Sequence, residues 1–128
     1  MSSMRSSSGA RRDPSWMTMP MIALRALEVL HAQYAENLSL DWLAHTVGAD
    51  KYRVAKAFKR LTGLPPHAFQ TRLRISAARR LLASEMSLVE IALECGFSSQ
   101  AHLNRHFGRF LGVTPGLFRR ILREGRRS

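Results

Sequence analysis

The sequence is short of cysteine, of acidic residues and of long apolar runs, and each shortage excludes a class of protein. Its 128 residues include one cysteine, Cys95, so no internal disulfide can form and a reducing cytoplasm is the expected compartment. No run of about 18 apolar residues occurs, so we expect no transmembrane helix. The first residues, MSSMRSSSGARRDPSW, have no apolar h-region, so we expect no secretory signal.

Residues typical of catalytic and metal sites are also missing or isolated. The acidic residues are scattered and form no paired-carboxylate pattern, and neither a glycine-rich phosphate loop nor a nucleophile elbow occurs, so we expect neither catalysis nor a cofactor. His102 and His106 have a spacing that can hold zinc, but no third ligand lies near in sequence, so no metal is expected. Cys95 lies in an apolar stripe, which favours a buried and inert thiol.

Basic residues, by contrast, are abundant. The chain has 20 Lys and Arg against 9 Asp and Glu, for a net charge of +11, and all but Lys51, Lys56 and Lys59 are arginines. A planar guanidinium suits phosphates and guanine edges, so this balance indicates a polyanionic partner, most often nucleic acid. A basic helix on a membrane surface and simple solubility are the alternative explanations of the charge.

Apolar residues recur at steps of three and four, and no segment shows sustained alternation, which predicts an all-α fold of seven helices. The expected helices cover about residues 20–37, 40–47, 51–62, 66–84, 88–95, 99–111 and 115–122. The residues expected to face inward include Met21, Leu24, Leu27, Leu30, Tyr34, Val54, Phe58, Leu61, Leu103, Phe107 and Phe110.

The same layout occurs twice along the chain. At an offset of 48, Ser39-Leu40 matches Ser87-Leu88, Leu43-Ala44 matches Ile91-Ala92 and Gly48 matches Gly96. At an offset of 49, Phe58 matches Phe107, Gly63 matches Gly112, Pro66 matches Pro115 and Phe69 matches Phe118. Each copy has the capping residue, short helix, glycine turn and second helix of a helix-turn-helix. A pair of αα-hairpins without a ligand is the alternative.

This repeat predicts the domain organisation. Two helix-turn-helix subdomains are expected within a domain of residues 20–122, the first over 20–64 and the second over 85–122. A long connecting helix over 65–84 should hold their second helices in successive major grooves of one duplex, about 34 Å apart. Residues 1–19 are expected to be a disordered arm or linker, and residues 123–128 a basic tail.

The outer face of the helix over 51–62 carries five cations and no acid, whereas a merely solvated face usually mixes charges of both signs. Because the N-terminal half of a recognition helix enters the major groove, the candidates for base contacts are Tyr52, Ala55 and Lys56. The candidates for contacts to the DNA backbone are Lys51, Arg53, Lys59 and Arg60.

The outer face of the helix over 99–111 is polar but less charged. Gln, Asn and Arg are side chains that can make bidentate contacts to base edges, so this helix is the expected stronger reader of sequence. Its base-contact candidates are Gln100, Ala101, Asn104 and Arg105, and its backbone candidates are His102 and Arg109.

Several stretches together resemble the AraC/XylS family of bacterial transcription regulators. They are SLVEIA at 87–92, CGF at 95–97, HLNRHF at 102–107, GVTP at 112–115 and Phe118-Arg119, with Leu73, Ala77, Ala78, Arg79, Leu81 and Leu82 in the connecting helix. The resemblance covers about residues 20–122 and implies two helix-turn-helix units that bind promoter DNA and usually activate transcription. The family's base-contacting positions fall on the base-contact candidates named above. Ala55 and Ala57 are small where members often have longer side chains.

We therefore predict a sequence-specific regulator that binds double-stranded promoter DNA, in the cytoplasm at the nucleoid. The domain should be monomeric, with no membrane partner and with RNA polymerase as a candidate partner. The alternatives are a protein-interaction module that docks on RNA polymerase and a non-specific nucleic-acid-binding protein. Most members of the family also have a sensing or dimerisation domain, so the sequence is either a stand-alone regulator or the C-terminal piece of a longer one.

Overall fold

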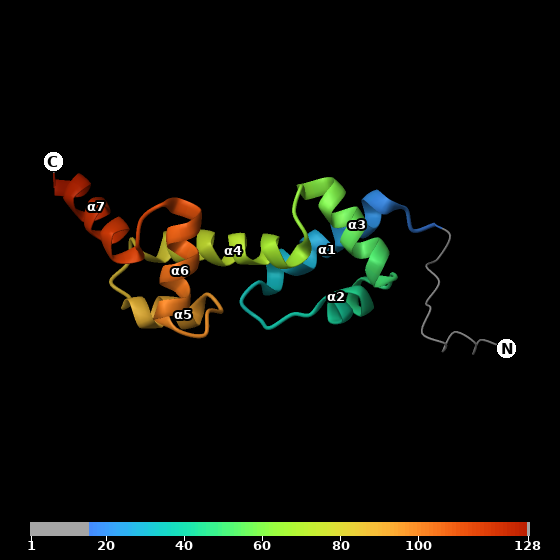
Figure 1. The fold of residues 1–128 in the computed structure, drawn as a ribbon, viewed down its shortest axis with the longest axis horizontal. Helices are drawn as coiled ribbons and strands as arrows, with labels where there is room; N and C mark the ends of the chain where they lie inside the picture. Colours follow the sequence, from blue (N-terminus) through green and yellow to red (C-terminus); the bar gives the residue numbers. More distant parts are fainter. Residues whose placement is uncertain (1–15, 128) are drawn as a thin grey trace. The chain divides into compact units, whose positions relative to one another are not determined.

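A computed structural model describes residues 16–127, and in that range the chain forms seven α-helices and no strand (Figure 1). This confirms the predicted all-α class and the number of helices. None of the helices in this range is both long and apolar enough to cross a membrane. The helices are α1 (Met19–Gln33), α2 (Leu40–Val47), α3 (Lys51–Thr62), α4 (Pro66–Leu81), α5 (Leu88–Glu94), α6 (Gln100–Leu111) and α7 (Pro115–Arg127).

The described chain divides into two compact units. Unit 1 contains the residues up to Gln33 together with Leu38–Phe69, and unit 2 contains Tyr34–Asn37 and the residues from Gln70 onward. The division therefore falls inside α4, whereas the sequence suggested that the connecting helix would stand between two subdomains. Met17 is buried in unit 1, so part of the predicted arm over 1–19 belongs to the folded structure. The rest of that arm, residues 1–15, lies outside the described residues.

In unit 1 the buried side of α1 differs from the predicted one. Met21 and Leu24, expected to face inward, are 39% and 52% exposed. Leu30 is buried as predicted, and the other buried residues are Ile22, Ala23 and Ala26. The helix packs against α2 and α3, and two alanines on its buried side allow a close approach that larger side chains would prevent.

The turns between the two helices of each helix-turn-helix share one backbone hydrogen bond, although the glycine N–H groups donate differently, from Gly48 to Ala44 (2.8 Å) and from Gly96 to Leu93 (3.2 Å). In unit 1 the N–H of Ala49 donates to the carbonyl of Ala44 (3.1 Å), and in unit 2 the N–H of Phe97 donates to the carbonyl of Ala92 (2.9 Å). These bonds span five residues around a glycine with positive φ, at 87° for Gly48 and 97° for Gly96, as in a Schellman motif. The repeat seen in the sequence is thus a repeat of backbone structure.

Aromatic packing repeats as well. Phe58 and Phe69 meet edge to face in unit 1, with ring centroids 5.2 Å apart. Phe107 and Phe118 do the same in unit 2, at 5.6 Å. Each pair joins the second helix of a helix-turn-helix to the helix that follows it, and edge-to-face pairs are favourable beyond the area they bury.

The last turn of both second helices departs from the prediction. Leu61 and Phe110, expected to face inward, are exposed. Each lies seven positions after a fully buried residue, Val54 or Leu103, so it has nearly the same angle around its helix. The exposure of Leu61 and Phe110 therefore comes from their place along the helix axis. The last turn of each helix extends past the residues that cover its first two turns.

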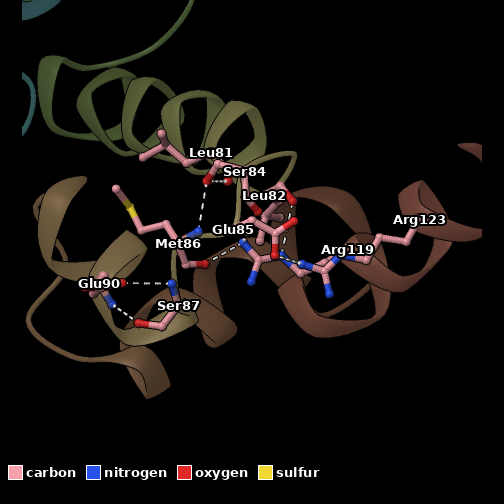
Figure 2. A network of polar contacts seen from close by, with 9 residues as sticks. All are labelled: Leu81, Leu82, Ser84, Glu85, Met86, Ser87, Glu90, Arg119 and Arg123. Carbon is pink, nitrogen blue, oxygen red and sulfur yellow. Dashed lines mark hydrogen bonds and ion pairs between the residues drawn. The ribbon is translucent and has the colours of Figure 1, made fainter.

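The C-terminal end of α4 is set by contacts from α7 (Figure 2). The guanidinium of Arg119 donates to the carbonyls of Leu82 (3.1 Å), Ser84 (3.2 Å) and Met86 (2.7 Å). These bonds satisfy carbonyls that would otherwise continue the helix, which explains why α4 ends at Leu81 and not near Ser84 as predicted. α7 itself continues to Arg127, so the predicted basic tail is mostly helical.

Candidate nucleic-acid interface

α3 has the predicted limits, Lys51–Thr62, because both of its ends are defined by local residues. A side-chain oxygen of Asp50 accepts hydrogen bonds from the N–H groups of Tyr52 (3.0 Å) and Arg53 (3.3 Å), and Gly63 at φ 84° ends the helix. Val54, Ala57 and Phe58 are buried. The outward side chains are Tyr52, Lys56, Lys59 and Arg60, which are exposed, and Ala55, which is half-buried.

Two cations of α3 already have contacts within unit 1. The amino group of Lys51 lies 3.2 Å from a carboxylate oxygen of Asp41 and 5.6 Å from the ring centroid of Tyr52. The hydrogen bond and the charge of Asp41 raise the pKa of Lys51. Arg53 is half-buried and also has contacts. Of the four backbone candidates on this helix, Lys59 and Arg60 are therefore the exposed ones.

α6 presents the second set of candidates. The hydroxyl of Ser99 accepts a hydrogen bond from the N–H of His102 (3.1 Å) and caps the helix. On the outer face Ala101, Arg105 and Arg109 are exposed, whereas Gln100 and Asn104 are half-buried. The Oδ1 of Asn104, a predicted base-contact residue, is covered and has no hydrogen-bond partner among the described residues.

His102 is held by the turn before α6. Its Nδ1 accepts a hydrogen bond from the N–H of Ser98 (3.3 Å) and lies 3.0 Å from the Ser98 hydroxyl. The proton of the neutral ring therefore sits on Nε2. Burial, with smaller effects of Arg105 and Arg74, lowers the pKa of His102. This side chain can offer an N–H donor to a phosphate but carries little positive charge near neutral pH.

His102 and His106 do lie side by side, with ring centroids 4.7 Å apart, and both lie against the buried ring of Phe97. Among the described residues no group of three or more His, Cys, Asp or Glu is placed to hold a metal ion. The pair thus forms part of an aromatic cluster at the start of α6.

The candidate residues of the two helices occupy equivalent positions. The offset of 49 places Tyr52, Ala55 and Lys56 of α3 on Ala101, Asn104 and Arg105 of α6. Each helix therefore has an exposed cation at two equivalent positions, Lys56 with Arg105 and Arg60 with Arg109. Only arginine has a planar fork that can contact a guanine edge with two parallel hydrogen bonds. α3 has the greater positive charge, and α6 has the arginine at the first of these two positions.

Sequence reasoning missed the polar residues that hold the segment after α1 against α4 within unit 2. Gln70 and Arg74 both donate to the carbonyls of Tyr34 and Glu36, at 2.7–3.0 Å. The offset of 49 places Gln70 on Arg119, which appeared in the sequence only as part of the family pattern. Continuing the comparison of the two repeats past Pro66 and Pro115 would have identified Gln70 and Arg119. We call these two side chains the polar clamps.

Cys95 lies in the core of unit 2, where it is 1% exposed. Burial, with a smaller effect of Glu94, raises the pKa of its thiol to about 11. The thiolate is the reactive form of cysteine, so the surroundings of this thiol make it unreactive at neutral pH, as the sequence predicted.

Relatives of this chain are transcription regulators. A family model described as "Helix-turn-helix domain" matches residues 43–121. The transcriptional activator RhaS of Escherichia coli (strain SE11) is 34% identical over 98 residues, which cover 76% of this chain and 34% of RhaS. The activator AarP of Providencia stuartii is 31% identical over 91 residues, which cover 70% of this chain and 67% of AarP. The matches to the regulators YbfI of Bacillus subtilis and ArgR of Pseudomonas aeruginosa cover only 28% of each relative.

Solved structures agree with these relatives. The DNA-binding domain of AdpA, determined in complex with a target DNA, is 32% identical with a TM-score of 0.72, over 91% of this chain and 98% of that domain. An AraC-type regulator from Chromobacterium violaceum is also 32% identical, with a TM-score of 0.72 over 77% of this chain and 88% of that structure. A helix-turn-helix family model matches more than half of this chain, and an AraC-type regulator is 32% identical to it over 77% of its length. The chain therefore belongs to the AraC/XylS family of transcription regulators.

Proposed function

We propose that this chain binds double-stranded promoter DNA in a sequence-specific way, with α3 and α6 as recognition helices in successive major grooves. The observation that carries the proposal is the equivalence of the two outer faces. Both helices follow the same glycine turn, and both present an exposed cation at the same position of the repeat, Lys56 or Arg105. A pair of hairpins with no nucleic-acid ligand has no need for matching cations at these positions.

The two helices are proposed to contribute differently. On α6, Arg105 is the residue for a guanine edge, and Gln100 is the residue for an adenine edge. On α3, Tyr52 and Ala55 would contact thymine methyl groups, and Lys56 a guanine or a phosphate. The proposed contacts to the DNA backbone come from Lys51, Arg53, Lys59, Arg60, His102 and Arg109.

Asn104 can make a two-bond contact to an adenine edge only if its amide turns. Its Oδ1 is covered in the free protein and has no partner among the described residues. A covered amide oxygen without a hydrogen bond is unfavourable by about 1–3 kcal/mol. Rotation of the amide toward an adenine edge would relieve this cost, so DNA provides a reason for a rotamer change at Asn104.

The wider role proposed is activation of transcription by a domain that binds as a monomer, in the cytoplasm at the nucleoid and with RNA polymerase as a second partner. The names of RhaS and AarP, both activators, support the direction of regulation. The complex of AdpA with its target DNA supports double-stranded DNA as the ligand. We infer no enzymatic activity, since the relatives RhaS and AarP are transcription regulators.

Selection of bound duplexes from a random pool at fixed salt tests this function. Two recognition helices in successive grooves should select two short conserved blocks about one helical turn apart, 10–10.5 base pairs centre to centre. Binding without any selected motif would identify a non-specific nucleic-acid-binding protein instead. Failure to retain duplex at low salt would favour the protein-interaction module.

A further inference from the structure

The C-terminal half of α4 and the middle of α7 line a shallow open groove on unit 2. Its lining residues are Ser76, Arg79, Arg80, Ala83, Phe118 and Leu122. The apolar part of this lining comes from Ala83 and the two half-buried α7 side chains, and the charged part from two exposed arginines of α4. We call these six residues the α4–α7 groove.

The two arginines of the groove have contacts, but none with a carboxylate. The guanidinium of Arg79 lies 5.8 Å from the centroid of the Phe118 ring. The guanidinium of Arg80 donates to the hydroxyl of Ser76 (3.3 Å). Neither arginine forms an ion pair with a described residue. The groove thus combines an apolar lining with two positive charges that no described carboxylate neutralises.

Acidic residues are absent from this part of the chain. The sequence contains no Asp or Glu between Asp50 and Glu85. Glu85 is itself paired with Arg123, at 3.2 Å (Figure 2). Glu124 of α7 follows Leu122 by two positions, so it points to the other side of that helix. A ligand of the groove must therefore supply the negative charge.

The internal repeat shows that the fold does not require this pair of arginines. The offset of 48 places His31 of α1 on Arg79, and that of 49 places Phe69 on the phenylalanine of the groove. His31 and Phe69 also meet, with ring centroids 6.0 Å apart. The exposed Ala32 stands where the groove has Arg80. The same packing is thus compatible with histidine and alanine, so the arginine pair needs another explanation.

We propose that the α4–α7 groove binds an acidic protein segment in which carboxylates flank an aromatic side chain. The carboxylates would pair with Arg79 and Arg80, and the aromatic ring would cover Phe118 and Leu122. Arginine is enriched in protein–protein interfaces, which commonly have an apolar centre and a polar rim. A DNA backbone is bound through charge and hydrogen bonds, so it would engage the arginines and make no use of the apolar lining. The inference goes beyond DNA binding and does not depend on it.

The test uses the full chain and a synthetic helical peptide in which glutamates three and four residues away flank one phenylalanine. Two matched control peptides have glutamines in place of the glutamates or alanine in place of the phenylalanine. Titration followed by NMR should shift the signals of Phe118 and Leu122 with the parent peptide and much less with either control. Shifts located elsewhere, or equal shifts with the parent and a control peptide, would overturn the proposal.

Two variants with the same loss of charge separate the groove from the general charge of the chain. R79H/R80A introduces the residues that α1 has at the equivalent positions, so the fold should tolerate it. Peptide affinity measured near pH 8 should fall about fivefold, since two charge pairs are lost. R60A/R109A removes two exposed arginines from α3 and α6, and should lower affinity less than about twofold at physiological salt, because distant charges are screened. Equal losses would contradict the assignment.

Two further measurements distinguish other occupants. DNA affinity at physiological salt should be the same for R79H/R80A and the parent chain, whereas a fall would identify nucleic acid as the occupant and overturn the choice of partner. Sedimentation should show that the full chain does not self-associate through the groove. A dimer that is lost in R79H/R80A would identify a second copy as the occupant and would likewise overturn the proposal.

Discussion

The glycine turns of the two helix-turn-helix units both have a glycine with positive φ at the equivalent position, but the surroundings of the two glycines differ. Gly48 in unit 1 has nothing within 4 Å of the place where a Cβ would stand. A Cβ on Gly96 in unit 2 would lie 2.6 Å from the carbonyl oxygen of Ala35 and 2.8 Å from Nε of Arg74. One copy of the motif needs glycine for its backbone conformation alone, whereas the other also needs the space. Equivalent positions of a repeat therefore differ in what a substitution does to them.

The largest expected effect is that of Gly96→Ala. A positive φ costs an alanine about 1–2 kcal/mol, and the close contact adds about 1–3 kcal/mol, so unit 2 should lose about 2–5 kcal/mol. Gly48→Ala, the matched control, should cost unit 1 only the first of these, about 1–2 kcal/mol. Hydrogen exchange of amides in α5 and α6, and in α2 and α3, measures the two units separately. Equal losses would show that the contact of Gly96 with residue 35 is not maintained in solution.

The second comparison is between the polar clamps Arg119 and Gln70. Arg119→Ala removes the three hydrogen bonds to the carbonyls of Leu82, Ser84 and Met86, for which no second side-chain donor stands among the described residues. Unit 2 should therefore lose about 2–3 kcal/mol of stability. Gln70→Ala should cost about 1 kcal/mol, because Arg74 still donates to the same two carbonyls. Chemical denaturation of each variant measures both losses. A larger loss for Gln70→Ala would reverse the comparison.

These clamps also explain which parts of the fold the sequence could predict. α3 was predicted to the residue because Asp50 and Gly63 are local signals at its two ends. The ends of α1 and α4 were placed three or four residues too late, because carbonyls near them are taken by side chains from distant parts of the chain: Gln70 and Arg74 for the segment after α1, and Arg119 for the segment after α4. Helix periodicity contains no information about such long-range donors.

The same distinction applies to the candidate interface. The exposed positions of Lys56, Lys59 and Arg105 followed from the period of each helix. Three other features of the interface could not be predicted from the helix period, because each depends on a neighbour that periodicity does not identify. They are the ion pair of Lys51 with Asp41, the hydrogen bond from Ser98 to His102 and the covered oxygen of Asn104.

Arg105 and Lys56, equivalent cations of the two units, should differ in their effect on DNA binding. Arg105→Ala is expected to weaken binding to the selected site by about 1–3 kcal/mol and to relax one base position. Lys56→Ala should weaken specific binding less, since a point charge lacks the bidentate geometry of the guanidinium. Quantitative binding to a set of single-base variants measures both. Equal losses on specific and random duplexes would contradict a base contact by Arg105.

Lys59 on α3 is expected to contact a phosphate and no base, so its removal should change the salt dependence of binding and not the base preference. Lys59→Ala should leave base preference unchanged and reduce the slope of log affinity against log salt by about 1 unit, because one fewer phosphate counterion is released. The slope is obtained from titrations at four or five salt concentrations. An unchanged slope would remove Lys59 from the set of backbone contacts.

Cys95 and Val47 stand at equivalent positions of the repeat, and Cys95→Val should have the smallest effect. At pH 7 the thiol is protonated and behaves as a small apolar group, so exchange for valine should change the stability of unit 2 by less than about 1 kcal/mol.

The pKa of the Cys95 thiol is raised from its ordinary value of 9.0 to about 11 in the folded chain. A raised pKa means that the folded state keeps the proton longer, so this contribution to stability is complete below pH 9 and is lost as the pH rises toward 11. Unfolding measured at pH 7 and pH 10 should therefore show the variant gaining stability relative to the parent chain at the higher pH. A constant difference between the two proteins would mean that the thiol titrates alike in both states and is not buried in solution.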